Sequence, residues 1–384
     1  MARIILGNRE GSFAIRQGRH VLERLTDEWP DLHLTLRTVS GTGGAEVQPL
    51  LDALVKGDVG MALVQLESLP NKLPEGLTLV AVPRRGEARS ALAARGRSSL
   101  AELDAGATVA VASPRDAAFL KAAHGGVAPE VVTDHTEALL GRLARGEFGA
   151  LVVPALALTT LDHRNAIDAV LEENEFTPAP GQGAIGLLVR EDDDVAFEAA
   201  YSLQHRPSFD RTRAERAFAA ALEGHMVGAL ATVTDDGELT LFGAAIQNGT
   251  TLQASTTGEA REAEDLGREL AQDVTAQLAA LSLAGRGLSR VAFGYHLVGH
   301  VLRYRLVTVG PERERAASAG HAAQVGGVGL DLRQWNVRGD HANGALAVHT
   351  QDPAAARVEV RDDVAGETVR HAHLHEHQGL EQDG

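Results

Sequence analysis

Residues 176–186, Phe-Thr-Pro-Ala-Pro-Gly-Gln-Gly-Ala-Ile-Gly, combine two prolines and three glycines in one short run. Proline holds φ near one value and removes a backbone donor, whereas glycine allows positive φ and lets a second backbone approach closely. Few other residues could follow the same backbone path. The run therefore predicts a fixed turn that leads into a buried strand over residues 184–189.

The first half of the chain alternates short apolar runs with longer amphipathic stretches, a pattern typical of α/β units with buried strands. Residues 3–6 predict a first strand, and residues 12–29 predict a helix that Pro30 ends. Residues 181–189 are expected to complete a second lobe. Beyond residue 285 the chain changes to alternating strands with glycine-rich links, which indicates a separate β-rich appendage.

These patterns predict an α/β protein of several domains, because 384 residues are too many for one ordinary core. The expected domains are residues 1–95 with 191–212, residues 96–190, a small α/β domain at 213–285, and a β-rich C-terminal extension with a His-rich tail at 286–384.

The charge of the chain disfavours several partners. With 36 Lys and Arg against 52 Asp and Glu, the net charge is −16, which argues against nucleic acid and anionic membranes. No apolar run reaches membrane-spanning length, and no signal peptide opens the chain, so we expect a cytoplasmic protein. The absence of cysteine excludes disulfides and thiolate chemistry.

Several motifs together carry a family resemblance. The run at 176–186 resembles the Pro-Ala-Pro-Gly-Gln-Gly-Ala signature of the porphobilinogen deaminase (hydroxymethylbilane synthase) family, and matches in the same order extend over residues 3–281. The other matching motifs are residues 7–17, 83–92, 146–150, 213–218 and 222–226. The resemblance implies two lobes built like a periplasmic binding protein, a third domain, and an enzyme that joins four porphobilinogen units on a dipyrromethane primer held by a cysteine.

Two residues depart from this family at positions where it carries chemistry. Met226 stands where the family has the primer-bearing cysteine, and its sulfur is already methylated. Ser68 stands where the family has the aspartate that stabilises a cationic intermediate, and Glu67 stands at a lysine. We expect Glu67 to point to the other side of an extended segment, so that it does not replace the aspartate. The departures predict that no dipyrromethane cofactor is bound.

The family's arginines for the acetate and propionate groups are also depleted. Arg115 is kept, but Asp116 reverses the charge of the next position, and Thr160 stands where a further arginine is usual. The residues that we expect to bind a small carboxylate or pyrrole ligand are Arg9, Gly11, Ser12, Ser113, Arg115 and Gln182. Alternatively, Arg9 and Arg115 are solvated or pair with the neighbouring carboxylates.

The C-terminal tail suggests another role. His371, His373, His375 and His377 alternate, and in a strand they would share one face at a spacing suited to Zn²⁺ or Ni²⁺. A solvated chain end is the alternative. We interpret residues 286–384 as an interaction module for an unknown protein partner.

Three functional hypotheses follow. The first is a catalytically inactive deaminase homologue that is kept for anion, ligand or partner binding. The second is an active hydroxymethylbilane synthase that uses a non-covalent primer. The third is a metal-binding or scaffold protein that acts through its C-terminal region.

Overall fold

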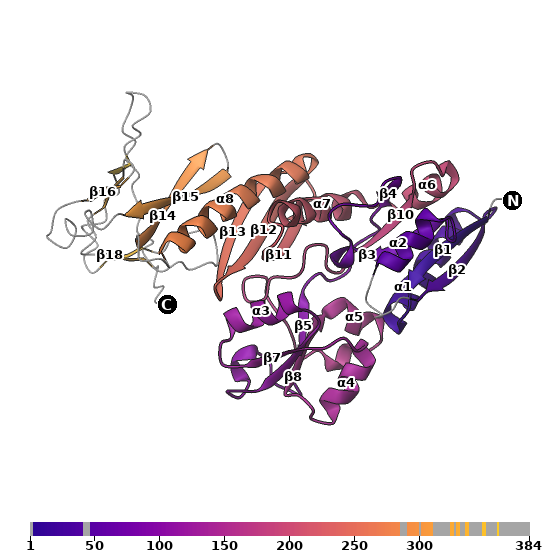
Figure 1. The fold of residues 1–384 in the computed structure, drawn as a ribbon, viewed down its shortest axis with the longest axis horizontal. Helices are drawn as coiled ribbons and strands as arrows, with labels where there is room; N and C mark the ends of the chain where they lie inside the picture. Colours follow the sequence, from indigo (N-terminus) through magenta and orange to yellow (C-terminus); the bar gives the residue numbers. More distant parts are fainter. Residues whose placement is uncertain are drawn as a thin grey trace, which may run out of the picture. The chain divides into compact units, whose positions relative to one another are not determined.

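The computed structural model describes residues 3–40 and 47–284, together with the strands at 290–298, 301–309, 323–325, 328–330, 335–337, 348–350 and 359–360 (Figure 1). Contacts divide the chain into two units. One contains Met1–Thr275 with Val298–Val301, and the other contains Ala276–Leu297 with Leu302–Gly384. Helices and strands alternate through the first unit, and the predicted α/β class is confirmed.

The first sheet has five strands in the order β2-β1-β3-β10-β4. The strands are β1 (Arg3–Arg9), β2 (His33–Val39), β3 (Met61–Gln65), β4 (Leu77–Ala81) and β10 (Ile185–Arg190). Strand β1 is parallel to β2 and β3, whereas β10 is antiparallel to β3 and β4. Three helices pack on the sheet: α1 (Ser12–Glu28) and α6 (Asp194–Tyr201) contribute to one core cluster, and α2 (Gln48–Val55) contributes to another.

Helix α1 illustrates how the sequence forms this layer. Its buried residues are Ala14, Gly18, Val21 and Leu25, which recur every three or four positions and so lie on one face. Gly11, with φ of 104°, turns the chain out of β1 and into the helix. The predicted helix is thus present and ends at Glu28, just before Pro30.

The second sheet also has five strands, in the order β7-β6-β8-β5-β9. The strands are β5 (Ser90–Ala93), β6 (Thr108–Val111), β7 (Ala128–Val131), β8 (Ala150–Pro154) and β9 (Ala169–Val170). Helix α3 (Pro114–Ala123) contributes to one of its core clusters, whereas α4 (Thr136–Ala144) and α5 (Ala155–Thr160) contribute to another. Short 3-10 turns lie at η2 (Leu100–Glu102) and η3 (Arg164–Ala166).

The two sheets share one topology. In the first sheet β1 lies between the parallel strands β2 and β3, and in the second sheet β6 lies between the parallel strands β7 and β8. An antiparallel strand then separates β3 from β4, and another separates β8 from β9. That antiparallel strand comes from the crossing between the lobes: β10 in the first sheet and β5 in the second. The two-lobed fold expected from the sequence is therefore confirmed.

The two strands at the connections between the lobes, β5 and β10, correct two expectations from the sequence. Residues 181–189 were expected to complete the second lobe, but β10 pairs with β3 and β4 of the first sheet. Residues up to 95 were expected in the first lobe, but β5 pairs with β8 and β9 of the second sheet. The physical reason is pairing between distant segments, which a local apolar run does not specify.

The third domain is a three-stranded antiparallel sheet with two helices on one face (Figure 1). Its elements are α7 (Arg206–Ala221), β11 (Met226–Val233), β12 (Glu238–Gln247), β13 (Thr250–Glu259), the 3-10 turn η4 (Ala260–Glu262) and α8 (Ala263–Ala284). A Cβ at Gly243 would lie 2.7 Å from Phe218 of α7 and 2.9 Å from Leu270 of α8, so glycine lets both helices pack directly on β12.

The described strands of the second unit run from β14 (Arg290–Val298) and β15 (Val301–Val309) to short strands further on. The short strands are β16 (Ala323–Val325), β17 (Val328–Leu330), β18 (Trp335–Val337), β19 (Val348–Thr350) and β20 (Glu359–Val360). Within the described residues, no helix combines the length and apolar character needed to cross a membrane.

Candidate functional site

The first lobe places polar side chains where its parallel strands end. Strand β1 ends at Arg9 and β3 ends at Gln65, and Arg9 donates a hydrogen bond from Nη2 to Gln65 Oε1. Gln65 in turn donates from Nε2 to Gln17 Oε1 over 2.9 Å. The carboxyl ends of strands are where open α/β sheets bind ligands. We call Arg9, Gln65 and Glu67 the strand-end cluster.

Glu67 lies in a 3-10 turn, η1 (Leu66–Ser68), and not in an extended segment. The premise that this segment is extended was therefore wrong, and strand alternation does not apply to a 3-10 turn. Its Oε2 atom is buried and has no hydrogen-bond partner among the described residues. Burial raises the pKa of Glu67 to about 7, against the lowering effect of Arg9 and Arg85, while Asp116 raises it further.

Helix α7 of the third domain holds this turn in place. Arg216 donates from Nη1 to Leu66 O over 3.2 Å and to Leu69 O over 2.9 Å, and from Nη2 to Pro70 O over 2.8 Å. Ser68 ends the turn and is half-buried. The backbone around Glu67 and Ser68 is thus fixed by a side chain about 150 residues away in sequence.

The second lobe contributes the start of α3. Ser113 is the N-cap of α3: its Oγ accepts from Asp116 N over 3.1 Å and donates to Asp116 Oδ2 over 2.7 Å. Arg115 donates from Nε to Val227 O over 2.8 Å, from Nη1 to Asp116 Oδ1 over 2.7 Å, and from Nη2 to Thr177 O. Its guanidinium also lies 4.1 Å from the ring centroid of Phe119. Ser113 and Arg115, which were predicted to bind a ligand, therefore already form hydrogen bonds with other groups of the protein.

Gln182 is also committed to the protein interior. It is buried, and its Nε2 donates to Ala88 O over 2.6 Å. Next to it, a Cβ at Gly183 would lie 2.4 Å from Glu87 O, and Gly183 has a φ of 76°. The Pro- and Gly-rich run thus makes the predicted turn because two chain segments cross in close contact there.

A buried ion pair joins this crossing to the third domain. Arg85 and Glu215 pair over 2.6 Å, with side-chain exposures of 1% and 0%. Arg85 also donates to Gln182 O over 2.7 Å, while Glu215 accepts from Gly181 N over 2.7 Å and from Ala231 N over 2.8 Å. Sequence reasoning used these residues only as members of matching motifs and missed their role. The signal was present in the charged residues Arg85 and Glu215, which lie within those motifs.

Gly11 and Ser12 lie where the two lobes touch. Ser12 Oγ donates to Glu137 Oε2 of α4, and a Cβ at Gly11 would lie 3.2 Å from the imidazole of His135. Arg16 adds a hydrogen bond to Thr160 O over 3.0 Å. The first turn of α1, where backbone donors favour anions, therefore faces residues of the second lobe.

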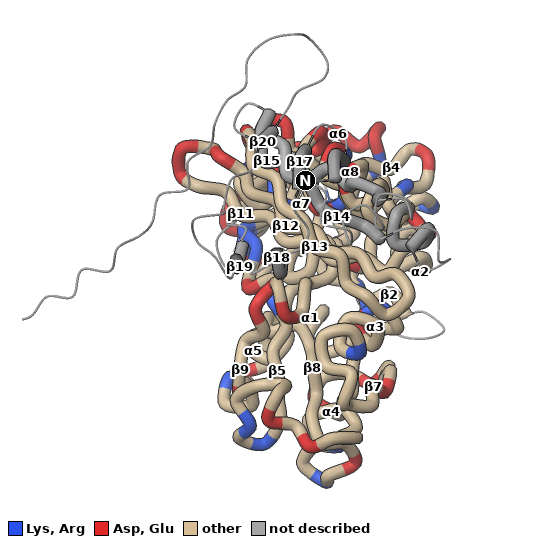
Figure 2. The backbone as a smooth tube through the Cα atoms, turned by 90° about the vertical axis from the view of Figure 1, so that its left-hand side faces the viewer, with Lys and Arg blue, Asp and Glu red and all other residues tan. Residues whose placement is uncertain are grey.

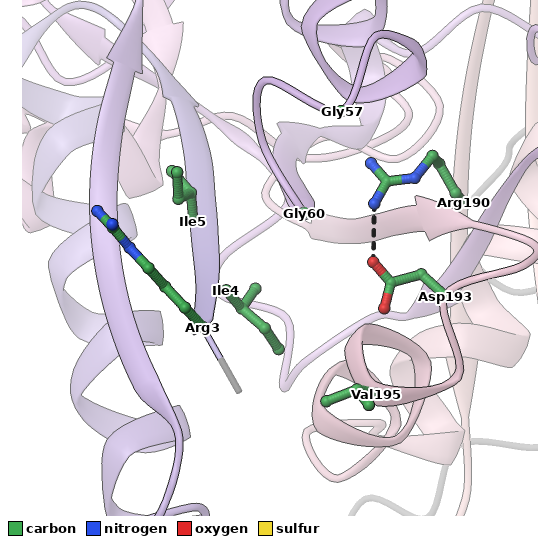
Figure 3. Close-up of a pocket in the computed structure, with 8 residues that line it drawn as sticks. All are labelled: Arg3, Ile4, Ile5, Gly57, Gly60, Arg190, Asp193 and Val195. Carbon is green, nitrogen blue, oxygen red and sulfur yellow. Dashed lines mark hydrogen bonds and ion pairs between the residues drawn. The ribbon is translucent and has the colours of Figure 1, made fainter. Parts of the chain in front are cut away.

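One cavity of 360 Å³ lies elsewhere in the first lobe, by the amino-terminal ends of β1 and β3 (Figure 3). Its Arg190 donates from Nη1 to Leu54 O and Val59 O, each over 3.0 Å, and pairs through Nη2 with Asp193 over 2.8 Å. The basic side chain is thus satisfied by the protein. Because the cavity lies opposite the carboxyl ends of the strands, we do not assign the ligand site to it.

Comparison with known proteins bears on the family. A family model described as "Porphobilinogen deaminase, dipyromethane cofactor binding domain" matches residues 4–198. Porphobilinogen deaminase of Thermus thermophilus is 36% identical over 291 residues, covering 72% of this chain and 97% of that protein. The chain belongs to the porphobilinogen deaminase family. The Deinococcus radiodurans porphobilinogen deaminase is 34% identical over 296 residues, covering 71% of this chain and 96% of that protein.

Solved structures with a similar arrangement are more distant. A putative methionine-binding lipoprotein of Bacillus subtilis has 11% identity and a TM-score of 0.38, covering 53% of this chain and 90% of that one. The methionine-binding protein MetQ has 16% identity and a TM-score of 0.37, covering 52% and 89%. The assignment to the deaminase family therefore depends on the family model and on the sequence relatives.

The family match corrects the expectation that this chain has no cofactor. The matched domain is the one that binds the dipyrromethane cofactor, and it includes the whole strand-end cluster. The residues present fit a non-covalently held dipyrrole, because the unpartnered Glu67 Oε2 can accept from a pyrrole N–H and Arg9 can meet a carboxylate. Attachment is a separate matter: the chain has no cysteine, and Met226, which is 41% exposed at the start of β11, lies beyond the matched residues.

The predicted metal site stays untested. His371, His373, His375 and His377 lie outside the described residues, as does most of the interaction module predicted at 286–384. In the described part of the chain, no group of three or more His, Cys, Asp or Glu residues is arranged to hold a metal ion.

Proposed function

We propose that this member of the porphobilinogen deaminase family binds a small pyrrole carboxylate at the strand-end cluster and does not polymerise it. The observation that carries the proposal is Ser68, a neutral hydroxyl at the end of η1 where the family resemblance requires the catalytic carboxylate. A dipyrromethane supplies the growing end of a pyrrole chain when it is bound. Without a carboxylate at position 68, the charge that would stabilise the cationic intermediate is missing, and its loss is worth several kcal/mol.

The residues of the first lobe divide the binding task. Arg9 presents its guanidinium at the end of β1, where it can pair with a ligand carboxylate. In the second lobe, Arg115 and Asp116 neutralise each other over 2.7 Å, so that side adds little net charge. We therefore expect the site to bind a ligand with one carboxylate better than an oligopyrrole with many carboxylates.

The charge distribution is consistent with a small ligand. In the part of the chain that Figure 2 colours, acidic residues gather on the segment into α6, where residues 191–194 are all acidic, and basic residues are scattered. The predictions that nucleic acid and membranes are not partners, and that the protein is cytoplasmic, stay predictions.

Purified full-length protein incubated with porphobilinogen should form hydroxymethylbilane at least about 100-fold more slowly than the Thermus thermophilus relative, because a missing electrostatic stabiliser costs roughly that factor or more. The measurement is absorbance of the oxidised product over time, with the relative as positive control under the same conditions. Bilane formation at the relative's rate would refute the proposal.

A second candidate is an active enzyme that uses a non-covalent primer. The match of residues 4–198 to the cofactor-binding domain favours it, as does the intact run at 176–186. The same assay with added free dipyrromethane separates the two candidates. Under our proposal the added dipyrrole leaves the rate unchanged, whereas a rise to the relative's rate would establish the second candidate.

A further inference from the structure

Helix α7 begins at a group of basic side chains that shares no residue with the strand-end cluster. His205 is the N-cap of α7, and Ser208 Oγ lies 2.8 Å from His205 Nδ1 and accepts from Arg211 Nη2 over 3.3 Å. The same oxygen accepts from Arg85 N over 2.8 Å, which fixes the backbone next to Arg84 at the start of α7. We call Arg84, His205 and Arg211 the α7 basic cluster.

The cluster lacks a counter-charge of its own. Among the described residues, Arg211 donates only to neutral oxygens, from Nε to Pro207 O over 3.2 Å and from Nη2 to Ser208 Oγ. Arg84 is exposed and makes no hydrogen bond or ion pair with the described part of the chain. Like charges held close together without a carboxylate repel each other, so an anion placed between them would be stabilised.

The carboxylates of α7 are committed elsewhere. Asp210 pairs with Arg206 over 2.6 Å, and the buried Glu215 pairs with Arg85 over 2.6 Å. Burial lowers the pKa of Arg211, whereas Glu215 raises it. Because Glu215 already balances Arg85, it leaves the positive charge of Arg211 largely uncompensated.

The hydrogen bonds of His205 assign its proton. Ser208 Oγ accepts from two N–H groups, so its hydroxyl donates to Nδ1, which also accepts from Ser208 N over 3.3 Å. The neutral ring therefore carries its proton on Nε2, which has no partner among the described residues. Burial lowers the pKa of His205, and Arg84, Arg211 and Arg24 of α1 lower it further. At neutral pH the cluster thus offers two guanidinium groups and one neutral N–H donor.

We propose that the α7 basic cluster binds a phosphate group, with the guanidinium groups of Arg84 and Arg211 and the Nε2–H of His205 as its donors. A phosphate group carries nearly two negative charges at neutral pH and three strong acceptor oxygens, so it supplies the missing counter-charge. A carboxylate carries one charge and two oxygens, and therefore compensates the cluster less. The site goes beyond the proposed function, because it uses none of the residues assigned to the pyrrole ligand.

The test titrates inorganic phosphate into the full-length protein by isothermal titration calorimetry at about pH 7.5 in about 0.15 M sodium chloride. Phosphate should bind with a dissociation constant below about 1 mM, and acetate at least about 10-fold more weakly. Phenyl phosphate separates the two sources of this chemistry. Binding as tight as that of inorganic phosphate indicates a phosphate ester, whereas no binding of the ester indicates free phosphate.

Arg84→Gln and Arg211→Gln should each weaken phosphate binding at least about 10-fold, because each removes one charged donor. Arg164→Gln is the matched control: it removes one exposed arginine, in η3 of the second lobe, and should change the affinity less than about 2-fold. Circular dichroism checks that each variant is folded. If Arg211→Gln does not fold, Arg84→Gln decides, since Arg84 is exposed.

A second readout follows the histidine itself. Binding and protonation are linked, so an anion at Nε2 raises the pKa of His205. Sulfate is the probe here, because its charge stays constant from about pH 5 to about pH 8. In NMR titrations, saturating sulfate should make protonation of one histidine about 10-fold more favourable. That signal should be absent from His205→Asn, in which asparagine keeps an acceptor at the N-cap.

Three results would each overturn the inference. They are phosphate affinity that Arg84→Gln leaves within about 2-fold of the natural value, acetate binding as tight as phosphate binding, and sulfate that leaves every histidine unchanged. None of these results bears on bilane formation, so the phosphate site and the proposed function stand or fail separately.

Discussion

Replacing Glu215 with glutamine should lower the free energy of unfolding by about 3–5 kcal/mol, because it leaves the Arg85 guanidinium buried and without its counter-charge. Glu215 is fully buried and accepts from Gly181 N and Ala231 N as well as from Arg85. These contacts join the crossing between the lobes to the third domain. The loss should therefore appear in the main unfolding transition of the first unit, followed by circular dichroism in urea.

The control for this prediction is an exposed ion pair. Arg268 and Asp265 pair over 2.7 Å on α8, with side-chain exposures of 52% and 68%. Asp265→Asn should change stability by less than about 1 kcal/mol, because solvent screens such pairs. Glu215→Gln would contradict the prediction if its transition shifted no further than that of the control.

Much of the fold could be predicted from apolar periodicity. The buried face of α1 and the run that forms β1 are local patterns, and local patterns are what a sequence displays. The sheet to which β5 and β10 belong is not local. Each is a short buried run that would satisfy either sheet, and its place depends on partners such as β3 and β8 far along the chain.

The site was harder to predict than the fold. Arg115 and Gln182 have residue types that bind carboxylates, but their donors reach backbone carbonyls that come near only after folding. The expectation for Glu67 depends on an extended segment, whereas Glu67 lies in a 3-10 turn, to which strand alternation does not apply. Arg216, which fixes that turn, belongs to another domain. Residue type indicated which side chains are able to bind a carboxylate, and tertiary contacts decided which of them already bind other groups of the protein.

Glu67 should also make stability depend on pH, and glutamine at this position should remove that dependence. The folded protein raises the pKa of Glu67 from its ordinary value of 4.5 to about 7, chiefly by burial. Below the ordinary value the carboxyl is protonated in both states, and no penalty arises. As the pH rises through this window the unfolded chain releases the proton while the folded protein keeps it, so stability falls and then levels off above pH 7. The full loss corresponds to roughly 3 kcal/mol.

The decisive quantity is the stability of Glu67→Gln minus that of the natural protein, measured by urea unfolding from about pH 5 to about pH 8. Other titrating groups are present in both proteins and largely cancel, so the difference should grow with pH and reach about 2–3 kcal/mol in favour of the variant. Glu102→Gln should not show this rise, because hydrogen bonds from Ser98 lower the pKa of Glu102 and keep it ionised throughout. A difference that stays flat for Glu67→Gln would mean that Glu67 ionises like an ordinary surface carboxylate.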